Sequence, residues 1–296
     1  MRLIESSYKI LPQESSLDGI YKMCEIAGRT AYKSEDRITE GSAKRFVESL
    51  MKLNHGAVLE HGTVYLKVSH TSPVADRDYM EKMNVVHFYA KNKYSKYKRV
   101  TEDHFHIDNY ITTNLRVLLE NNRLDDLQYL CEPTEHHEKR VTVKFICSRS
   151  IAQEITRHRV FSFLMESQRY VAYNKDKFGG EITYIIPDWV KLRMNDLSED
   201  DFTNCQDKAV KRWWEAMRYA EYEYMGLIEE GLKAEEARSV LPNDCKTELV
   251  MTGFISDWEH FFDLRALDKT GKAHPDIKAL ACPLRAEFIL NEYVND

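Results

Sequence analysis

The chain has 296 residues and a net charge of −6, with 43% hydrophobic and 30% charged residues, which is typical of an ordinary globular protein. The acidic balance excludes a global basic footprint for nucleic acid, and no apolar run approaches the ~20 residues that span a bilayer. No signal-peptide pattern follows Met1, and six scattered cysteines without a CxxC pair favour a reducing compartment, so we expect a cytoplasmic protein without a membrane partner.

Hydrophobic periodicity predicts the elements of the first half of the chain. Strand-like alternation and helical spacing predict a strand over 1–12, helices over 15–33 and 41–54, and strands over 63–70 and 140–147. The intervening segment 71–139 is rich in Lys, Tyr and His. We expect this segment to be a helical insertion that leaves the sheet and returns to it.

The second half is predicted to be mostly helical. We expect helices over 149–160, 204–231 and 233–240, and a strand over 247–252. Ser256 to Glu259 is a capping-box pattern that should open a helix through Leu267, and Pro275 suits the first turn of a last helix. The fold is therefore predicted to be α/β (α+β): a mixed, mainly antiparallel sheet flanked by helices, within a single domain over 1–296.

The segment richest in chemistry is Arg157-His158-Arg159, followed after seven residues by Ser167-Gln168-Arg169-Tyr170. Arginine presents a planar fork that matches phosphate oxygens, so this cluster suits an anionic ligand, although solvated arginines on a surface helix would look the same. On a continuing helix, side chains two residues apart diverge by about 200°. Either the helix ends here, or the first two arginines serve different ligands or different subunits.

This spacing resembles the signature of the flavin-dependent thymidylate synthases. Three further motifs resemble that family in the same order along the chain. They are His55 to His61, the Ala-Arg-x-x-Leu-Pro run Ala237 to Pro242, and the segment His260 to Arg265, which Ala273-His274-Pro275 follows. No motif that resembles the family lies in 71–139 or in roughly 180–230.

The resemblance implies a role for each matching residue. The flavin, FAD, would be bound by His55, Arg157, His158, Arg159 and His260. The substrate dUMP would be bound by Glu154, Arg157, Glu166, Ser167, Gln168, Arg169, Arg238 and Arg265. Arg238 would reach the nucleotide from a neighbouring subunit of a homotetramer whose active sites are shared. Arg265 is the expected catalytic residue, because a fixed cation at the uracil ring stabilises its ionised form.

The implied reaction is the reductive methylation of dUMP to dTMP. The carbon donor would be 5,10-methylenetetrahydrofolate, NADPH would reduce FAD, and no cysteine nucleophile would take part. Four positions depart from the family pattern, since Leu164, Met165, Ala57 and Phe254 replace residues that are often polar. A binder that keeps the fold but has lost catalysis is therefore a competing interpretation.

Three single features allow different interpretations. Cys282 before Pro283 could suggest a cysteine mechanism, but we interpret it as a buried helix cysteine. The pairs His55 with His61 and His136 with His137 lack further ligands at zinc spacing, so we expect no metal. The run 91–99 (KNKYSKYKR) resembles a nucleic-acid patch, which makes a nucleic-acid-binding module the rival from another class. We favour a solvated face and no nucleic-acid partner.

Overall fold

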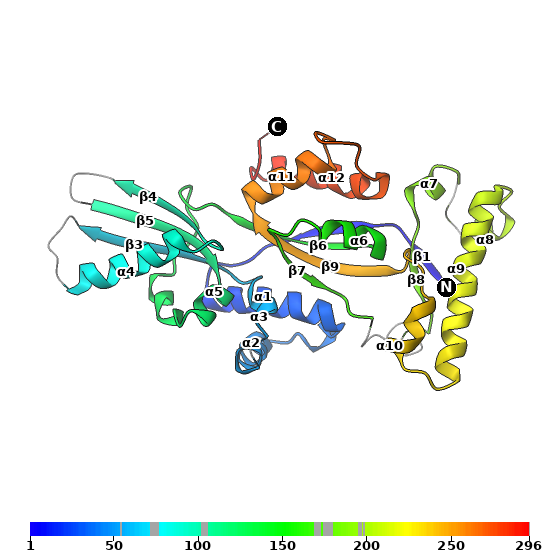
Figure 1. The fold of residues 1–296 in the computed structure, drawn as a ribbon, viewed down its shortest axis with the longest axis horizontal. Helices are drawn as coiled ribbons and strands as arrows, with labels where there is room; N and C mark the ends of the chain where they lie inside the picture. Colours follow the sequence, from blue (N-terminus) through cyan, green and yellow to red (C-terminus); the bar gives the residue numbers. More distant parts are fainter. Residues whose placement is uncertain are drawn as a thin grey trace.

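The computed structural model describes residues 1–53, 55–71, 77–101, 106–168, 173, 180–194, 197 and 199–295. Figure 1 shows an elongated molecule with a central sheet, a second sheet at one end and a long helix at the other. The central sheet has the strand order β2-β6-β9-β7, and each neighbouring pair is antiparallel. Its strands are β2 (Ser7–Leu11), β6 (Arg140–Ser148), β9 (Lys246–Phe254) and β7 (Ser162–Met165).

One face of the central sheet forms the main core. Alternate apolar residues such as Val143, Phe145 and Met251 point to this face, where they pack against Trp258 and Phe288. Three helices cover it, namely α6 (Arg149–Ile155), α11 (Ile255–Arg265) and α12 (Pro275–Leu290). Pro275 occupies the first turn of α12 as predicted, and the His274 side chain caps that helix by accepting a hydrogen bond from Asp276 N–H.

The opposite side is covered by α1 (Leu17–Tyr32), α2 (Ser42–Lys52) and α3 (Gly56–Leu59), with a short 3₁₀ turn η1 (Glu35–Arg37). The first two helices were predicted at these places. Ser16 caps α1 by accepting a hydrogen bond from Gly19 N–H at 3.1 Å. The helix ends at Lys33, whose φ of 49° is left-handed.

The segment 71–139 contains helices and also two strands that were not predicted from the sequence. Its elements, with the strand that precedes it, are β3 (Thr63–Thr71), α4 (Arg77–Lys91), β4 (Lys96–Thr101), β5 (His106–Asn114), α5 (Leu115–Glu120) and η2 (Leu124–Tyr129). The strands form a sheet of order β3-β5-β4, with α4 packed on one face through Val85, Val86 and Tyr89. Lysines concealed β4, and Asp108 and Asn109, whose residue types are uncommon in strands, concealed β5.

The remaining elements lie at the other end of the molecule in Figure 1. They are β1 (Arg2–Ile4), which is parallel to β8 (Thr183–Ile185), followed by α7 (Asp188–Lys191), α8 (Glu199–Asn204), α9 (Lys208–Glu229), α10 (Ala234–Ala237) and η4 (Arg238–Val240). Trp213 and Trp214 are buried in a third core, and the Trp213 indole N–H donates to Asp244 at 2.7 Å.

The fold class is confirmed, but three local predictions were wrong. The single strand over 1–12 is two strands in different sheets. The helix predicted over 149–160 ends at Ile155. Ser256 does not cap α11, because its hydroxyl donates to Glu138 at 2.5 Å, whereas the Asp257 carboxylate accepts the Phe254 N–H.

Candidate active site

The turn Arg157–Arg159 follows the end of α6 and leads into β7. Its backbone is held by the His158 N–H, which donates to Ile155 O at 3.1 Å, and by the Phe161 N–H, which donates to His158 O at 3.2 Å. Of the two possibilities left open by the sequence, the helix therefore ends before Arg157. Arg157 and Arg159 are exposed while His158 between them is buried. We call Arg157–Ser162 the RHR end of β7.

At the RHR end, three side chains from two helices and the turn meet. Arg265, the last residue of α11, donates from Nε to His158 Nε2 at 3.0 Å and from Nη1 to Glu154 Oε2 of α6 at 3.3 Å. The Arg265 side chain keeps 19% of its surface exposed. All three residues were predicted as site residues from the sequence, and the structure brings them together.

His158 is neutral in this arrangement. An arginine N–H can only donate, so His158 Nε2 accepts and the imidazole proton is on Nδ1. Burial and the nearby Arg265, His260 and Arg157 lower the pKa of His158 to about 4. In the contact between the two residues, Arg265 is therefore charged and His158 is not.

Aromatic packing fixes the floor beneath this cluster. The His158 ring meets Phe261 edge to face at a centroid distance of 5.0 Å, and Phe161 meets Trp258 at 4.9 Å. Gly253 of β9 is required here, because a Cβ at that position would lie 2.3 Å from the Phe161 ring. The position of His158 is thus set by a packed core and not by a loop.

The other end of β7 carries the residues predicted for the dUMP phosphate. We call Glu166–Gln168 the Ser167 end of β7. The Ser167 N–H donates to Ala31 O of α1 at 3.1 Å, and the Gln168 side-chain amide donates to the Tyr173 hydroxyl at 3.4 Å. Glu166 is buried and accepts from Lys246 Nζ at 2.9 Å. Arg169 lies outside the described residues.

Three other predicted residues lie apart from this cluster. His260 is exposed on α11, and its proximity is among the causes that lower the pKa of His158. His55 is exposed at the start of α3, which packs on the α1 side of the central sheet, opposite α6 and α11. Arg238 is exposed in η4 beside α9, at the far end of the molecule from the three-stranded sheet (Figure 1).

The four departures from the family pattern occupy different environments. Leu164 packs against the α1-side core and Met165 against the main core. Phe254 is buried, with Arg140 and Lys96 each 5.4 Å from its ring centroid, while Ala57 is exposed. Packing and cation–π contacts thus occupy three of these four positions.

The charged residues that surround Glu166 were not predicted from the sequence. These are Lys33, Lys144, Lys246, Glu35 and Glu248. A signal was present in the alternation Lys246-Thr247-Glu248, because residues two apart on a strand share a face. Two residues of opposite charge that lie on the same face of a strand, among buried neighbours, indicate an internal ion pair.

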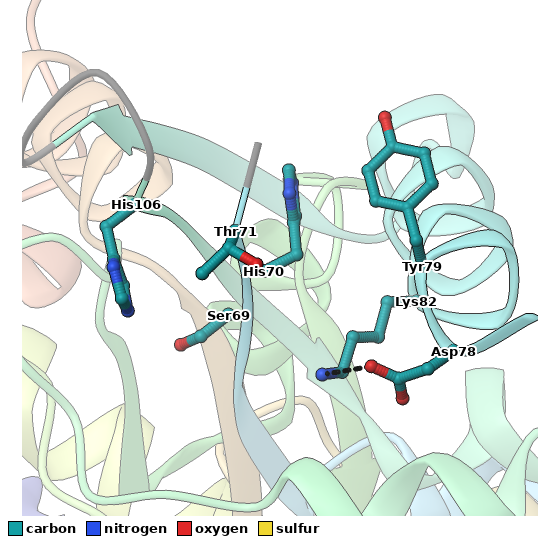
Figure 2. Close-up of a pocket in the computed structure, with 7 residues that line it drawn as sticks. All are labelled: Ser69, His70, Thr71, Asp78, Tyr79, Lys82 and His106. Atoms are coloured by element: carbon teal, nitrogen blue, oxygen red, sulfur yellow. Dashed lines mark hydrogen bonds and ion pairs between the residues drawn. The ribbon is translucent and has the colours of Figure 1, made fainter. Parts of the chain in front are cut away.

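A separate polar pocket of about 360 Å³ lies where β3 ends and β5 begins, beside α4. Figure 2 shows it lined by His70, His106, Tyr79 and neighbouring residues, with the Lys82 ammonium paired to Asp78 at 2.9 Å. Within the described ranges, no cluster of three or more His, Cys, Asp or Glu side chains could hold a metal ion. The same part of the chain contains no helix long and apolar enough to cross a membrane.

Cys282 lies in α12, as predicted, but the interpretation as a buried cysteine was wrong. Its side chain is exposed, and its Sγ contacts Ala266 O at 3.7 Å, next to Arg265. Pro283 follows it inside the helix. A thiol near the candidate site therefore has to be tested directly.

Comparison with known proteins decides the family. A family model described as thymidylate synthase complementing protein (Thy1) matches residues 77–289. The chain belongs to the Thy1 family. The resemblance found in the motifs is thereby confirmed, and the match includes the RHR end, the Ser167 end and Arg265.

Relatives of this Thy1 chain include two proteins named flavin-dependent thymidylate synthase. The one from Pyrococcus horikoshii is 31% identical over 42% of this chain, and the one from Synechocystis is 34% identical over 48%. The matched segments span 44% and 63% of those two proteins. A solved structure of the UMP/dUMP methylase PolB from Streptomyces cacaoi, bound with 5-Br dUMP, covers 98% of the chain at 18% identity and a TM-score of 0.44.

Proposed function

We propose that this chain is a flavin-dependent thymidylate synthase that converts dUMP to dTMP, with 5,10-methylenetetrahydrofolate as the carbon donor and NADPH as the reductant. The observation that carries the proposal is the Arg265 guanidinium, held by His158 and Glu154 at the RHR end of β7. Family membership and the names of the relatives support the same reaction.

Arg265 is the proposed catalytic residue. Two of its nitrogen atoms are occupied by His158 and Glu154, which orients the plane of the guanidinium and leaves other N–H groups for a ligand. A preoriented cation stabilises negative charge that develops on the uracil ring, and so makes C5 a better nucleophile. Neutral His158 positions this cation without adding a competing charge.

The proposed nucleotide site extends along β7. The four residues of β7 span roughly 13 Å, and this length separates the RHR end from the Ser167 end. We propose that the nucleotide lies along β7, with its base near Arg265 and its phosphate near Ser167, Gln168 and Arg169. Glu154, Arg157 and Arg238 complete the proposed substrate contacts.

The exposed side chains of the RHR end fit FAD. Arg157 and Arg159 are both solvent-accessible, and so is His260, so they can reach the pyrophosphate and ring edge of a dinucleotide bound on the surface. When bound there, FAD supplies the reducing equivalents that convert the transferred methylene into a methyl group. The chain's own residues bind, orient and exclude water, and no cysteine nucleophile takes part.

The active site is proposed to be shared between the subunits of a homotetramer. His55 lies on the other side of the sheet from α6, and Arg238 lies in η4 beside α9. Contributions from a second copy would bring both residues to the RHR end, whereas a fully active monomer would contradict this assembly. The single domain over 1–296, the cytoplasmic location and the lack of nucleic-acid and membrane partners stay predictions.

The test is release of tritium from 5-tritiated dUMP by the full chain, with and without FAD and NADPH. We expect release that depends on both cofactors and on the carbon donor. A colourless protein without release would contradict the proposal, and binding of single-stranded nucleic acid through 91–99 would then identify the rival module. A yellow protein that binds dUMP without release would identify a binder that has lost catalysis.

A further inference from the structure

The Ser167 end of β7 is surrounded by a closed network of six charges. Glu248 of β9 is its centre, since it binds Lys33 and Lys144 in close ion pairs and Lys246 at 2.5 Å. Lys246 also binds Glu166 at 2.9 Å, which joins the centre to the end of β7. Glu35 closes the network from η1, at 3.6 Å from both Lys33 and Lys144.

The centre of the network is buried, and its charges are balanced. The side chains of Glu166 and Glu248 are 3% and 7% exposed, and Lys246 is 15% exposed. Three ammonium groups face three carboxylates, and the lysines lower the pKa of Glu248 to about 2. A buried charge that loses its partner is strongly disfavoured, so each member restricts the positions that the others can adopt.

Backbone hydrogen bonds connect this network to Ser167. The Glu166 N–H donates to Glu248 O at 2.8 Å, and the next N–H, that of Ser167, donates to Ala31 O at 3.1 Å. Ala31 precedes Lys33, whose left-handed backbone ends α1 and whose ammonium binds Glu248. Ser167 is therefore held between α1 and β9 by two peptide hydrogen bonds and one chain of ion pairs.

We propose that Lys246 is a positioning residue for the nucleotide phosphate. Through Glu166 and Glu248 it fixes the Ser167–Gln168 backbone in the conformation that receives the phosphate. Glu166 then acts through its ion pair with Lys246 and does not contact the substrate. This inference rests on the proposed function, because it assumes that Ser167 binds the phosphate of dUMP.

The test compares Lys246→Met with Lys246→Arg and with Lys67→Met in the full chain. Lys67 is a matched control, because it is a strand lysine in the distant three-stranded sheet and binds the buried Asp108 at 2.6 Å. The measurements are the Kd for radiolabelled dUMP by equilibrium dialysis and hydrogen exchange of peptides covering 164–168. Absorbance of bound FAD and the melting temperature report on the rest of the molecule.

We expect Lys246→Met to raise the Kd for dUMP about tenfold or more, because small displacements of binding groups are costly, and to speed exchange at Ser167. Lys246→Arg should restore both, and Lys67→Met should change neither. Unchanged dUMP binding and unchanged exchange in Lys246→Met would overturn the proposal, as would equal weakening by Lys67→Met.

Two further measurements keep the test decisive. If Lys246→Met does not fold, the double variant Lys246→Met with Glu166→Gln removes both buried charges, and it should fold while still binding dUMP weakly. If the unaltered chain binds no dUMP, the proposed function fails. Hydrogen exchange at 164–168 then decides alone whether Lys246 positions Ser167.

Discussion

The two ends of β7 use charge in opposite ways. At the RHR end, Arg157 and Arg159 are exposed, and Arg265 is held by His158 and Glu154 while other N–H groups of its guanidinium stay available. At the Ser167 end, three lysines and three carboxylates pair with one another around the buried Glu166 and Glu248. Charges that remain accessible can bind a ligand, whereas charges that are closed upon each other can only hold the backbone. Under the proposed function, the first end would act on the uracil ring and the second would hold the backbone that receives the phosphate.

The largest effect is expected from Arg265→Lys. Lysine keeps the charge but cannot hold His158 and Glu154 with a planar fork, so the step that consumes dUMP should slow by about 10²-fold or more. Reduction of FAD by NADPH should be little affected, because that half-reaction does not involve uracil. Stopped-flow measurement of both half-reactions separates them. Equal slowing of the two would show that Arg265 is a structural or flavin-binding arginine.

Replacing Arg157 and Arg159 by glutamine should weaken FAD binding by about tenfold or more for each charge-assisted hydrogen bond lost. Both residues are exposed, so the free energy of unfolding should change by less than about 0.5 kcal/mol. Absorbance of bound flavin against added FAD measures this. Arg193→Gln is the control, since Arg193 is exposed and pairs with Asp207 at 3.3 Å, away from α6. Unchanged FAD binding would show that these arginines are solvated surface residues without a role in binding the flavin.

The two ends of β7 also differ in what their sequence reveals. The sequence singles out the RHR end because its residues are adjacent and their types are diagnostic. The structure brings His158, Glu154 and Arg265 together there, and their roles stay predictions. The network around Glu248 was missed because its members come from five separate elements and touch only after folding. Lys33 and Lys144 have no pattern that distinguishes them from surface lysines.

The same limit applies to the fold. Long amphipathic helices and the strands β3, β6 and β9 follow from periodicity, whereas β4 was hidden by lysines on a sheet edge, where charge protects the strand from unwanted pairing. The early end of α6 was hidden because Arg157–Arg159 contain no glycine or proline to mark it. Tertiary contacts of His158 and Arg265 decide that boundary.

The two ends should also respond to acid in different pH windows. His61, which is fully buried and bonded to Thr252 opposite Ser162, has its pKa lowered to about 3, and His158 to about 4. Each binds a proton more readily when unfolded, so stability is complete above about pH 6.5 and falls as the pH decreases toward these values. His61 alone should cost about 2 kcal/mol at pH 5.

The pKa of Glu248 is lowered to about 2, so the stability from the Ser167 end persists to about pH 4.5 and is lost below it. Urea unfolding from pH 7.5 to 3.5 measures the upper window and the beginning of the lower one. His61→Asn should flatten the upper window, and Glu248→Gln the lower one. A loss confined to one window in the unaltered chain would contradict this separation.

The smallest effect is expected from Cys282→Ala. The thiol is exposed beside Ala266, one residue from Arg265, so it is the cysteine whose position most nearly permits a nucleophilic role among the described residues. If the RHR end works by a fixed cation and a bound flavin, tritium release should stay within about twofold of the unaltered chain, as for a surface substitution. Cys205→Ala, in the distant third core, is the matched control.

A fall of about 10³-fold with FAD still bound would instead indicate covalent catalysis by Cys282, because removing a true nucleophile costs at least that much. Arg265 would then stabilise charge on a covalent adduct, and the accessible end of β7 would combine electrostatic with nucleophilic chemistry.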